Sequence, residues 1–443
     1  MIKIRNKILA LVIVAFIITL VTAVVIKMNN DSNKQANETN ETNTVEVPVE
    51  SNTNWLRVNG TKIEDYKGNV VQLKGLSSHS VIDFAEVVTY ENLKKLKEEW
   101  GINCFRIAMY TDPNVNGYIQ TKEQNKENAI KIIDMCEQLG IYAVMDWHTL
   151  NDGNPQTYQA EAIEFFNEIS EKYKENPFLI YEVCNEPNNC TWIENVKPYA
   201  EEIIKTIRNN SPKSMIWVGV PGWGKNIADA KESPIEAENV AYTFHFYAGS
   251  MADDYRKSVE KCLDANLPVV VSECGITDLS GNGEIYKDEF AKWIDYLNSH
   301  KISWLFWQFS NKDESSSVLA KEYVVRKKVF GIPANTEENS TENNTVEPQE
   351  VWIETNYDIN NYLTETGKYV KEMLSREAPL VPITIQDDNT TNTVNTTVVE
   401  NTTNETNTTS IFNTNTTVNG VNTENTTETD LLRQLQELLN QQQ

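Results

Sequence analysis

The order of strand and helix signals is the feature that most restricts how this chain can fold. Between residues 71 and 307, short apolar runs alternate with longer stretches of helical spacing. Parallel strands are joined by crossover helices, so this order is typical of a parallel sheet. We expect strands at 71–76, 104–108, 142–146, 180–183, 215–218, 240–244, 269–272 and 302–307, and helices at 90–100, 126–139, 160–174, 196–209, 253–265 and 286–299. Eight strands in this pattern predict an α/β fold, the closed (β/α)8 TIM barrel.

Two of the expected strands end on a glutamate. The fourth runs into Asn185-Glu186-Pro187, and the seventh runs into Glu273. The carboxyl ends of parallel strands meet at one face of a barrel, so both carboxyl groups are expected there. Either residue alone would be an ordinary surface glutamate as readily as a functional one. Together they fit the hydrolysis of a glycosidic bond, in which one acid protonates the leaving oxygen and the other attacks carbon or activates water.

Composition divides the rest of the chain. Residues 29–53 and 377–429 are rich in Asn, Thr and Glu and nearly free of aromatic residues. Such segments cannot bury enough apolar surface to offset their conformational entropy, so we expect disordered linkers. Residues 54–376 have the size of one barrel, with a low-complexity insertion near 334–350. Residues 430–443 carry leucines at helical spacing, which predicts a short amphipathic helix.

The first 28 residues predict export from the cytoplasm. Basic residues at positions 3, 5 and 7 precede an uncharged apolar run from 8 to 26. A run of this length spans a bilayer, and the basic flank favours a cytoplasmic N-terminus. If uncleaved, the segment anchors the protein to the membrane; a signal peptide cleaved near Val21-Thr22-Ala23 is the alternative. Both accounts place the barrel outside the cytoplasm, either secreted or anchored to the cell membrane.

Charge and cysteine spacing exclude several partners. The formal net charge of −25 argues against nucleic acid. The six cysteines show neither CxxC spacing nor histidines at metal-ligand intervals, so we expect no metal site and no cofactor. Several of them lie in apolar strands or helices, which predicts buried free thiols. A disulfide between Cys184 and Cys190 is the alternative.

Stretches along the whole expected barrel carry a family resemblance. They are VQLKGLSSH (71–79), WGINCFRIAMY (100–110), DWH (146–148), YEVCNEPN (181–188), KPYAEEIIKTIRNN (197–210), YTFHFYAG (242–249), VSECG (271–275) and WLFWQFSNKDESS (304–316). In this order they resemble the glycoside hydrolase family 5 endoglucanases of clan A, in particular secreted bacterial cellulases. The resemblance covers about residues 71–314 and implies an endo-β-1,4-glucanase that acts on a β-glucan polysaccharide.

The resemblance also implies a double displacement that retains the anomeric configuration. Glu273 would be the nucleophile and Glu186 the acid/base, with their carboxyl groups about 5–5.5 Å apart. The supporting residues would be Arg106 beside the nucleophile, Asn185 on the sugar 2-hydroxyl, His245 beside the acid/base, and Tyr247 with its hydroxyl on the nucleophile. His245 and Tyr247 are two residues apart in a strand, so their side chains point to the same face.

Aromatic side chains are expected to form the sugar platform, because pyranose rings present apolar C–H faces to flat π systems. By resemblance, the substrate-binding residues are His79, Tyr110, His148, Trp223, Trp307, Lys312 and Glu314. Trp307 would lie beneath the cleaved sugar, and Lys312 and Glu314 would hydrogen-bond sugar hydroxyls.

Two departures from the family pattern put the substrate preference in doubt. Residues 80–84 read Ser-Val-Ile-Asp-Phe, so one stacking platform is expected to be missing. Cys274 follows the nucleophile where relatives usually carry Trp, which predicts a roomier pocket beside Glu273. These departures concern the preferred chain length and the affinity for crystalline cellulose. Within the enzyme class, the alternative is another clan A specificity: mannan, xyloglucan or mixed-linkage glucan. A non-catalytic glycan-binding surface protein is the alternative outside the enzyme class.

Overall fold

A closed barrel of eight parallel strands forms the centre of the molecule. The computed structural model describes residues 54–331, 349–355 and 357–377. The strands are β3 (Lys74–Ser78), β4 (Cys104–Tyr110), β5 (Tyr142–His148), β6 (Leu179–Glu182), β7 (Ile216–Gly219), β8 (Val240–Tyr247), β9 (Val269–Gly275) and β10 (Trp304–Phe309). They follow one another around the barrel, and β10 closes it against β3. Each overlaps an expected strand, so the predicted TIM barrel is confirmed.

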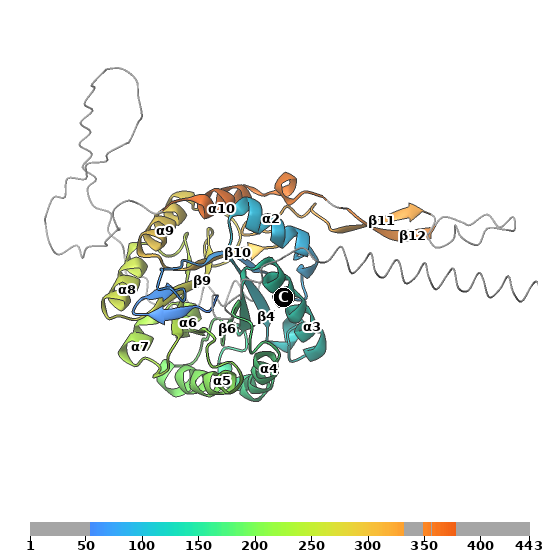
Figure 1. Cartoon of the computed structure of the whole chain (residues 1–443). Helices are drawn as coiled ribbons and strands as arrows, with labels where there is room; N and C mark the ends of the chain where they lie inside the picture. The colour runs from blue at the N-terminus through green and yellow to red at the C-terminus, as the bar shows by residue number, and fades with distance from the viewer. Residues whose placement is uncertain (1–53, 332–348, 356, 378–443) are drawn as a thin grey trace, which may run out of the picture. The chain divides into compact units, whose positions relative to one another are not determined.

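Helices surround this barrel (Figure 1). They are α2 (Tyr90–Trp100), α3 (Lys122–Leu139), α4 (Gln159–Lys172), α5 (Lys197–Asn210), α6 (Pro221–Gly224), α7 (Ile227–Glu232), α8 (Asp253–Asp264), α9 (Lys287–His300) and α10 (Glu365–Ser375). Short 3-10 or π turns lie at Ala85–Val87, Pro113–Val115, Pro155–Tyr158, Trp192–Val196 and Ile359–Tyr362. Helix α2 has the predicted bounds because both ends carry a local signal. The Thr89 side chain accepts a hydrogen bond from the Asn92 amide, and Gly101 ends the helix at a φ of 71°.

Two antiparallel hairpins were not expected. β1 (Arg57–Asn59) pairs with β2 (Lys62–Glu64), and the neighbouring apolar side chains Leu56 and Ile63 pack against residues at the starts of barrel strands, including Leu73. This first hairpin therefore covers the apolar bottom of the barrel interior. β11 (Arg326–Gly331) pairs with β12 (Gln349–Glu354) on either side of the predicted insertion.

Alternation along the strands sorts side chains into two environments. On β4, Phe105, Ile107 and Met109 belong to the core between barrel and helices, whereas Cys104 belongs to the apolar cluster inside the barrel. Arg106 lies one level above Cys104 and is fully buried. The barrel interior thus changes from apolar at the amino ends of the strands to charged near their carboxyl ends.

A bulge in β9 decides what that strand presents to the interior. Thr243 and His245 of β8 pair with Val270 and Glu273 of β9. Between these two pairs, β9 therefore has one residue more than β8. The register against β10 shifts in the same stretch of β9. An extra residue re-aims the side chains next to it. In consequence, Ser272 and Glu273 both make contacts in the barrel interior although they are adjacent in sequence.

Several predicted segments lie outside the described residues. These are the N-terminal segment (1–28), the first linker (29–53), nearly all of the insertion, the tail beyond residue 377 and the amphipathic helix (430–443). Among the helices that are described, none is long and apolar enough to cross a membrane.

The barrel wall leaves no space for a side chain at Gly75. A Cβ there would lie 1.7 Å from the backbone oxygen of Cys104, whereas a Cβ at Gly101 would have no atom within 4 Å. We expect Gly75→Ala to lower the free energy of unfolding by at least about 3 kcal/mol, because β3 and β4 must move apart. The matched control Gly101→Ala should cost about 1–2 kcal/mol, from its left-handed conformation. Denaturant unfolding measures both, and equal losses would contradict the steric argument.

Candidate active site

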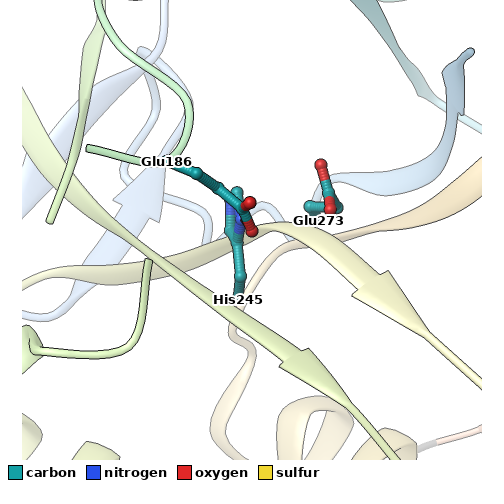
Figure 2. A group of neighbouring side chains, drawn as sticks. All are labelled: Glu186, His245 and Glu273. Carbon is teal, nitrogen blue, oxygen red and sulfur yellow. The ribbon is translucent and has the colours of Figure 1, made fainter. Parts of the chain in front are cut away.

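Glu186 and Glu273 face each other at the carboxyl ends of the strands (Figure 2). Glu273 lies on β9, and Glu186 lies in the loop that follows β6. One carboxylate oxygen of each and one ring nitrogen of His245 lie within 4.8 Å of one another. The structure therefore brings the two predicted carboxyl groups together, at a separation close to the roughly 5–5.5 Å of retaining glycosidases.

Arg106 is the cation of the site. Its guanidinium is fully buried, with Nη1 at 3.0 Å from Glu273, Nε at 2.7 Å from Glu182 and Nη2 at 2.9 Å from Asp146. Nη2 also donates to Asn185 Oδ1 at 2.6 Å. Burial alone would lower the pKa of Arg106, but the surrounding carboxylates raise it above its ordinary value. The guanidinium is thus a permanent charge that fixes four side chains from β5, β6, β9 and the loop after β6.

Asp146 and His148 form a second buried pair, with Oδ2 and Nδ1 2.6 Å apart. Burial raises the pKa of Asp146 although Arg106 opposes the shift, and burial lowers the pKa of His148. Neutral His148 can accept at Nε2 from Asn185 Nδ2, 3.3 Å away, and Thr149 O takes a second hydrogen bond from Nδ2. The Asn185 amide is therefore held by protein groups, and its contact with a sugar hydroxyl stays a prediction.

His245 and Tyr247 reach the two glutamates from β8. His245 Nδ1 lies 2.9 Å from Glu186 Oε1, and the Tyr247 hydroxyl donates to Glu273 Oε1 at 2.8 Å. Burial raises the pKa of Glu186 to about 7, against the opposing charges of Arg106 and Lys225. An acid with this pKa is partly protonated at neutral pH, as proton donation requires.

Glu186, His245 and Glu273 also have the residue types that bind metal ions. Both ring nitrogens of His245 are engaged, Nδ1 with Glu186 and Nε2 with Ser272 Oγ at 2.9 Å. These hydrogen bonds account for the group, and we assign no metal to it.

Four of the predicted substrate-binding residues form one aromatic cluster beside the carboxylates. The ring centroids of His148 and Trp307 are 5.4 Å apart with nearly parallel planes, and Tyr110 lies 4.3 Å from His148. His79 lies 5.6 Å from Trp307. Burial lowers the pKa of His79 to about 3, so the ring is neutral, and its Nδ1 has no hydrogen-bond partner among the described residues.

The other predicted binding residues lie around this cluster. Lys312 and Glu314, after β10, form an ion pair of 2.7 Å. Trp223 lies in the turn after β7, where its amide donates to Pro187 O at 3.2 Å. Its φ of 57° is unusual for a bulky residue, and it is followed by Gly224, where a Cβ would lie 2.7 Å from the His245 ring. The turn thus lies close to both His245 and the Glu186 loop.

The structure bears differently on the two expected departures from the family pattern. Phe84 packs edge-on against His79, with ring centroids 5.3 Å apart, and the absence of a sugar-stacking platform from segment 80–84 stays a prediction. Cys274 is fully buried in the core between barrel and helices. The prediction that this residue makes the pocket beside Glu273 roomier is wrong, because the bulge in β9 turns Glu273 inward and Cys274 outward. All six cysteines are free, which excludes the alternative Cys184–Cys190 disulfide.

Three residues that contact this site received no role from the sequence: Asp146, Glu182 and Ser272. Each carries a polar side chain within an apolar strand, and Asp146 precedes His148 by two residues, which places both on one face. A charged residue on the inward face of a strand is the signal that could have found Asp146 and Glu182. Ser272 is uncharged and carries no such signal, although it lies two residues after Val270, which faces the barrel interior.

A parallel barrel that brings two carboxyl groups this close at the carboxyl ends of its strands has the architecture of barrel glycoside hydrolases. Residues 64–313, more than half of the chain, match the family described as Cellulase (glycosyl hydrolase family 5). The chain therefore belongs to glycosyl hydrolase family 5, and the resemblance found in the sequence is confirmed.

Similar proteins carry consistent names. The chain is 40% identical over 265 residues to an endoglucanase of Clostridium saccharobutylicum, covering 60% of this chain and 59% of the relative. It is 41% identical over 254 residues to endoglucanase A of Evansella cellulosilytica, covering 57% and 51%. The chain thus spans little more than half the length of these relatives. Among solved structures, the catalytic domain of Thermobifida fusca endoglucanase Cel5A matches with a TM-score of 0.62 and 29% identity, over 73% of this chain and 98% of that domain.

The Arg106 network predicts a strong dependence on guanidinium geometry. A lysine ammonium cannot reach Asp146, Glu182 and Glu273 at once, so Arg106→Lys leaves buried carboxylates without a partner. We expect a loss of about 3–5 kcal/mol in the free energy of unfolding. Arg57 pairs with Glu64 but is 57% exposed, so Arg57→Lys should cost less than about 1 kcal/mol. Thermal and denaturant unfolding compare the two, and similar losses would show that the buried network is not needed for stability.

Proposed function

We propose that the protein is an extracytoplasmic endo-β-1,4-glucanase, a cellulase, that hydrolyses internal β-1,4-glucosidic bonds with retention. The observation that carries the proposal is the pair Glu186 and Glu273, whose carboxylate oxygens lie within 4.8 Å across the end of the barrel. This separation leaves no room for a water molecule between the two groups and so favours direct attack by one of them on the sugar.

In the first step, Glu273 attacks the anomeric carbon while Glu186 gives its proton to the leaving glycosidic oxygen. A covalent glycosyl-enzyme forms and the shorter glucan departs. In the second step, Glu186 removes a proton from water, whose oxygen displaces Glu273 from the same carbon. Two inversions at that carbon give net retention. The pKa of about 7 for Glu186 suits both duties, because the group must lose and regain a proton near neutral pH.

The surrounding residues orient Glu273 and bind the sugars. Arg106 Nη1 and the Tyr247 hydroxyl each donate to a different oxygen of Glu273, which fixes the plane of the carboxylate. The cluster of His79, Tyr110, His148 and Trp307 supplies the rings that would pack on pyranose faces. Trp223 would hold the sugar on the leaving-group side.

Different observations support the proposed substrate and the proposed location. Relatives named endoglucanase favour a β-1,4-glucan, and mannan, xyloglucan and mixed-linkage glucan are the alternatives. A location outside the cytoplasm is supported by the basic and apolar N-terminal segment of the sequence.

The first test measures reducing ends released from carboxymethylcellulose, glucomannan, xyloglucan and mixed-linkage glucan by the full chain and by Glu273→Ala. We expect release from carboxymethylcellulose by the natural chain and a loss of at least about 10⁴-fold in the variant. Added azide should partly restore cleavage by Glu273→Ala and give a product of inverted configuration. A folded natural chain that releases nothing from the four substrates would overturn the proposal, and preferential release from another glycan would redirect it.

The assignment of Glu186 has its own signature. Glu186→Gln cannot protonate a leaving group, so it should slow hydrolysis of cello-oligosaccharides by at least about 10²-fold. Aryl cellobiosides with acidic phenols need no protonation, and their glycosylation step should be nearly unaffected. Steady-state and burst kinetics on both substrate types measure the contrast. Equal losses on both would show that Glu186 is not the acid.

A further inference from the structure

A continuous row of hydrogen bonds runs from Glu186 into the barrel. Glu186 Oε1 lies 2.9 Å from His245 Nδ1, and His245 Nε2 lies 2.9 Å from Ser272 Oγ. Ser272 Oγ donates to Glu182 Oε1 at 2.6 Å, and Glu182 Oε2 accepts from Arg106 Nε at 2.7 Å. His245, Ser272 and Glu182 are buried. The end of the row is thus fixed by a permanent cation.

The number of hydrogens determines the direction of this row. Ser272 has one hydroxyl hydrogen, and it points to Glu182. Burial raises the pKa of this carboxyl, but Arg106 opposes the shift and its Nε holds Oε2, which leaves Oε1 to accept from Ser272. Ser272 Oγ therefore accepts from His245 Nε2, which must carry a hydrogen. Burial lowers the pKa of His245, so the ring is neutral and Nδ1 is bare. A bare Nδ1 can only accept, and the group that faces it is Glu186 Oε1.

We propose that Ser272 and Glu182 are positioning residues that lock His245 as the Nε2–H tautomer, so that Glu186 rests in its protonated form, ready to act as the acid. The proposal rests on the function proposed for Glu186 and extends it to two residues that do not touch the substrate. Ser272 faces His245 from the position two residues after the inward-facing Val270, and the bulge in β9 lets the next residue, Glu273, face Arg106 as well.

The lock raises the pKa of Glu186 for a simple reason. If Glu186 loses its proton, its carboxylate faces the lone pair of Nδ1, which is repulsive. With the other tautomer, Nδ1–H would donate to the carboxylate and stabilise it. During the reaction, the leaving oxygen takes the Glu186 proton and water returns one, so the hydrogens on His245 and Ser272 stay in place.

Other charged and titratable groups also face Glu186 and His245, and substitution of Ser272 leaves all of them unchanged. They are Arg106 and Tyr110 from β4, Asp146 and His148 from β5, Glu182 from β6, Lys225 after α6, Tyr247 from β8 and Glu273 from β9. Any displacement of the pH profile in a serine variant therefore reports the row of hydrogen bonds and not a change of charge.

The test is the pH dependence of kcat/KM for soluble β-glucan hydrolysis by the full chain, in which the alkaline limb reports deprotonation of Glu186. Ser272→Ala removes the hydroxyl that holds His245 as the Nε2–H tautomer, so the ring can place its hydrogen on Nδ1. We expect the alkaline limb to move about one pH unit toward acid. Ser272→Thr keeps the hydroxyl and should leave the limb in place. If Ser272→Ala does not fold, Ser272→Cys serves, because its thiol is a poor donor.

Glu182→Gln should reverse the direction of the hydrogen bonds in this row, because the side chain keeps its size but gains an NH2 group. Its amide oxygen must face Arg106, so its NH2 group donates to Ser272, whose hydroxyl then turns to Nε2 and leaves the hydrogen on Nδ1. We expect a shift of the alkaline limb toward acid. Loss of the Glu182 charge acts in the same direction, so Glu182→Gln is also measured in the Ser272→Ala background. A smaller shift there than in the natural background shows transmission through Ser272.

A second readout does not depend on activity. The ¹⁵N shifts of His245, assigned with His245→Asn, distinguish Nε2–H from Nδ1–H, and we expect the first in the natural chain and the second in Glu182→Gln. An unmoved limb in both Ser272→Ala and Glu182→Gln, or an Nδ1–H tautomer in the natural chain, would overturn the proposal. A natural chain that hydrolyses no glucan but shows the Nε2–H tautomer would instead refute the proposed function and leave the lock standing.

Discussion

The Arg106 guanidinium lies in the barrel interior without exposure to solvent, where an unpaired cation would cost several kcal/mol. Its partners come from three other strands and one loop, so the barrel must close correctly before the charge is compensated. This requirement couples folding to the geometry of the site. The residues that neutralise Arg106 include Glu273 itself, so the group proposed to attack the sugar is also part of the ion network that holds the barrel together.

The layers of the interior explain how a charged centre is tolerated in a small barrel. Apolar side chains and the β1–β2 hairpin fill the lower part, so water does not reach the ion network from below. Above it, the aromatic cluster covers the network at the carboxyl ends of the strands. Arg106 therefore exerts its field in surroundings of low polarity, where hydrogen bonds to a charge are strongest.

Periodicity predicted the fold well because strand and helix patterns are local. The eight strands and helix α2 carry their signals within a few residues, and motifs around Glu186 and Glu273 located the centre of the site. The features that the sequence did not predict are the two hairpins and the bulge in β9, which depend on contacts between residues apart in the chain. β1 and β2 have three residues each, too few for a periodic signal, and β11 and β12 are separated in the sequence by residues 332–348. The β9 bulge is visible only in the registers of β8 and β10. A strict two-residue alternation assigns Ser272 and Glu273 to opposite faces, whereas both make contacts in the barrel interior.

The six cysteines described earlier are all free. No covalent cross-link holds the described barrel, so its native state draws on packing, hydrogen bonds and ion pairs alone. A reductant therefore has no bond to break in this barrel, and its folding does not wait for an oxidant to form one.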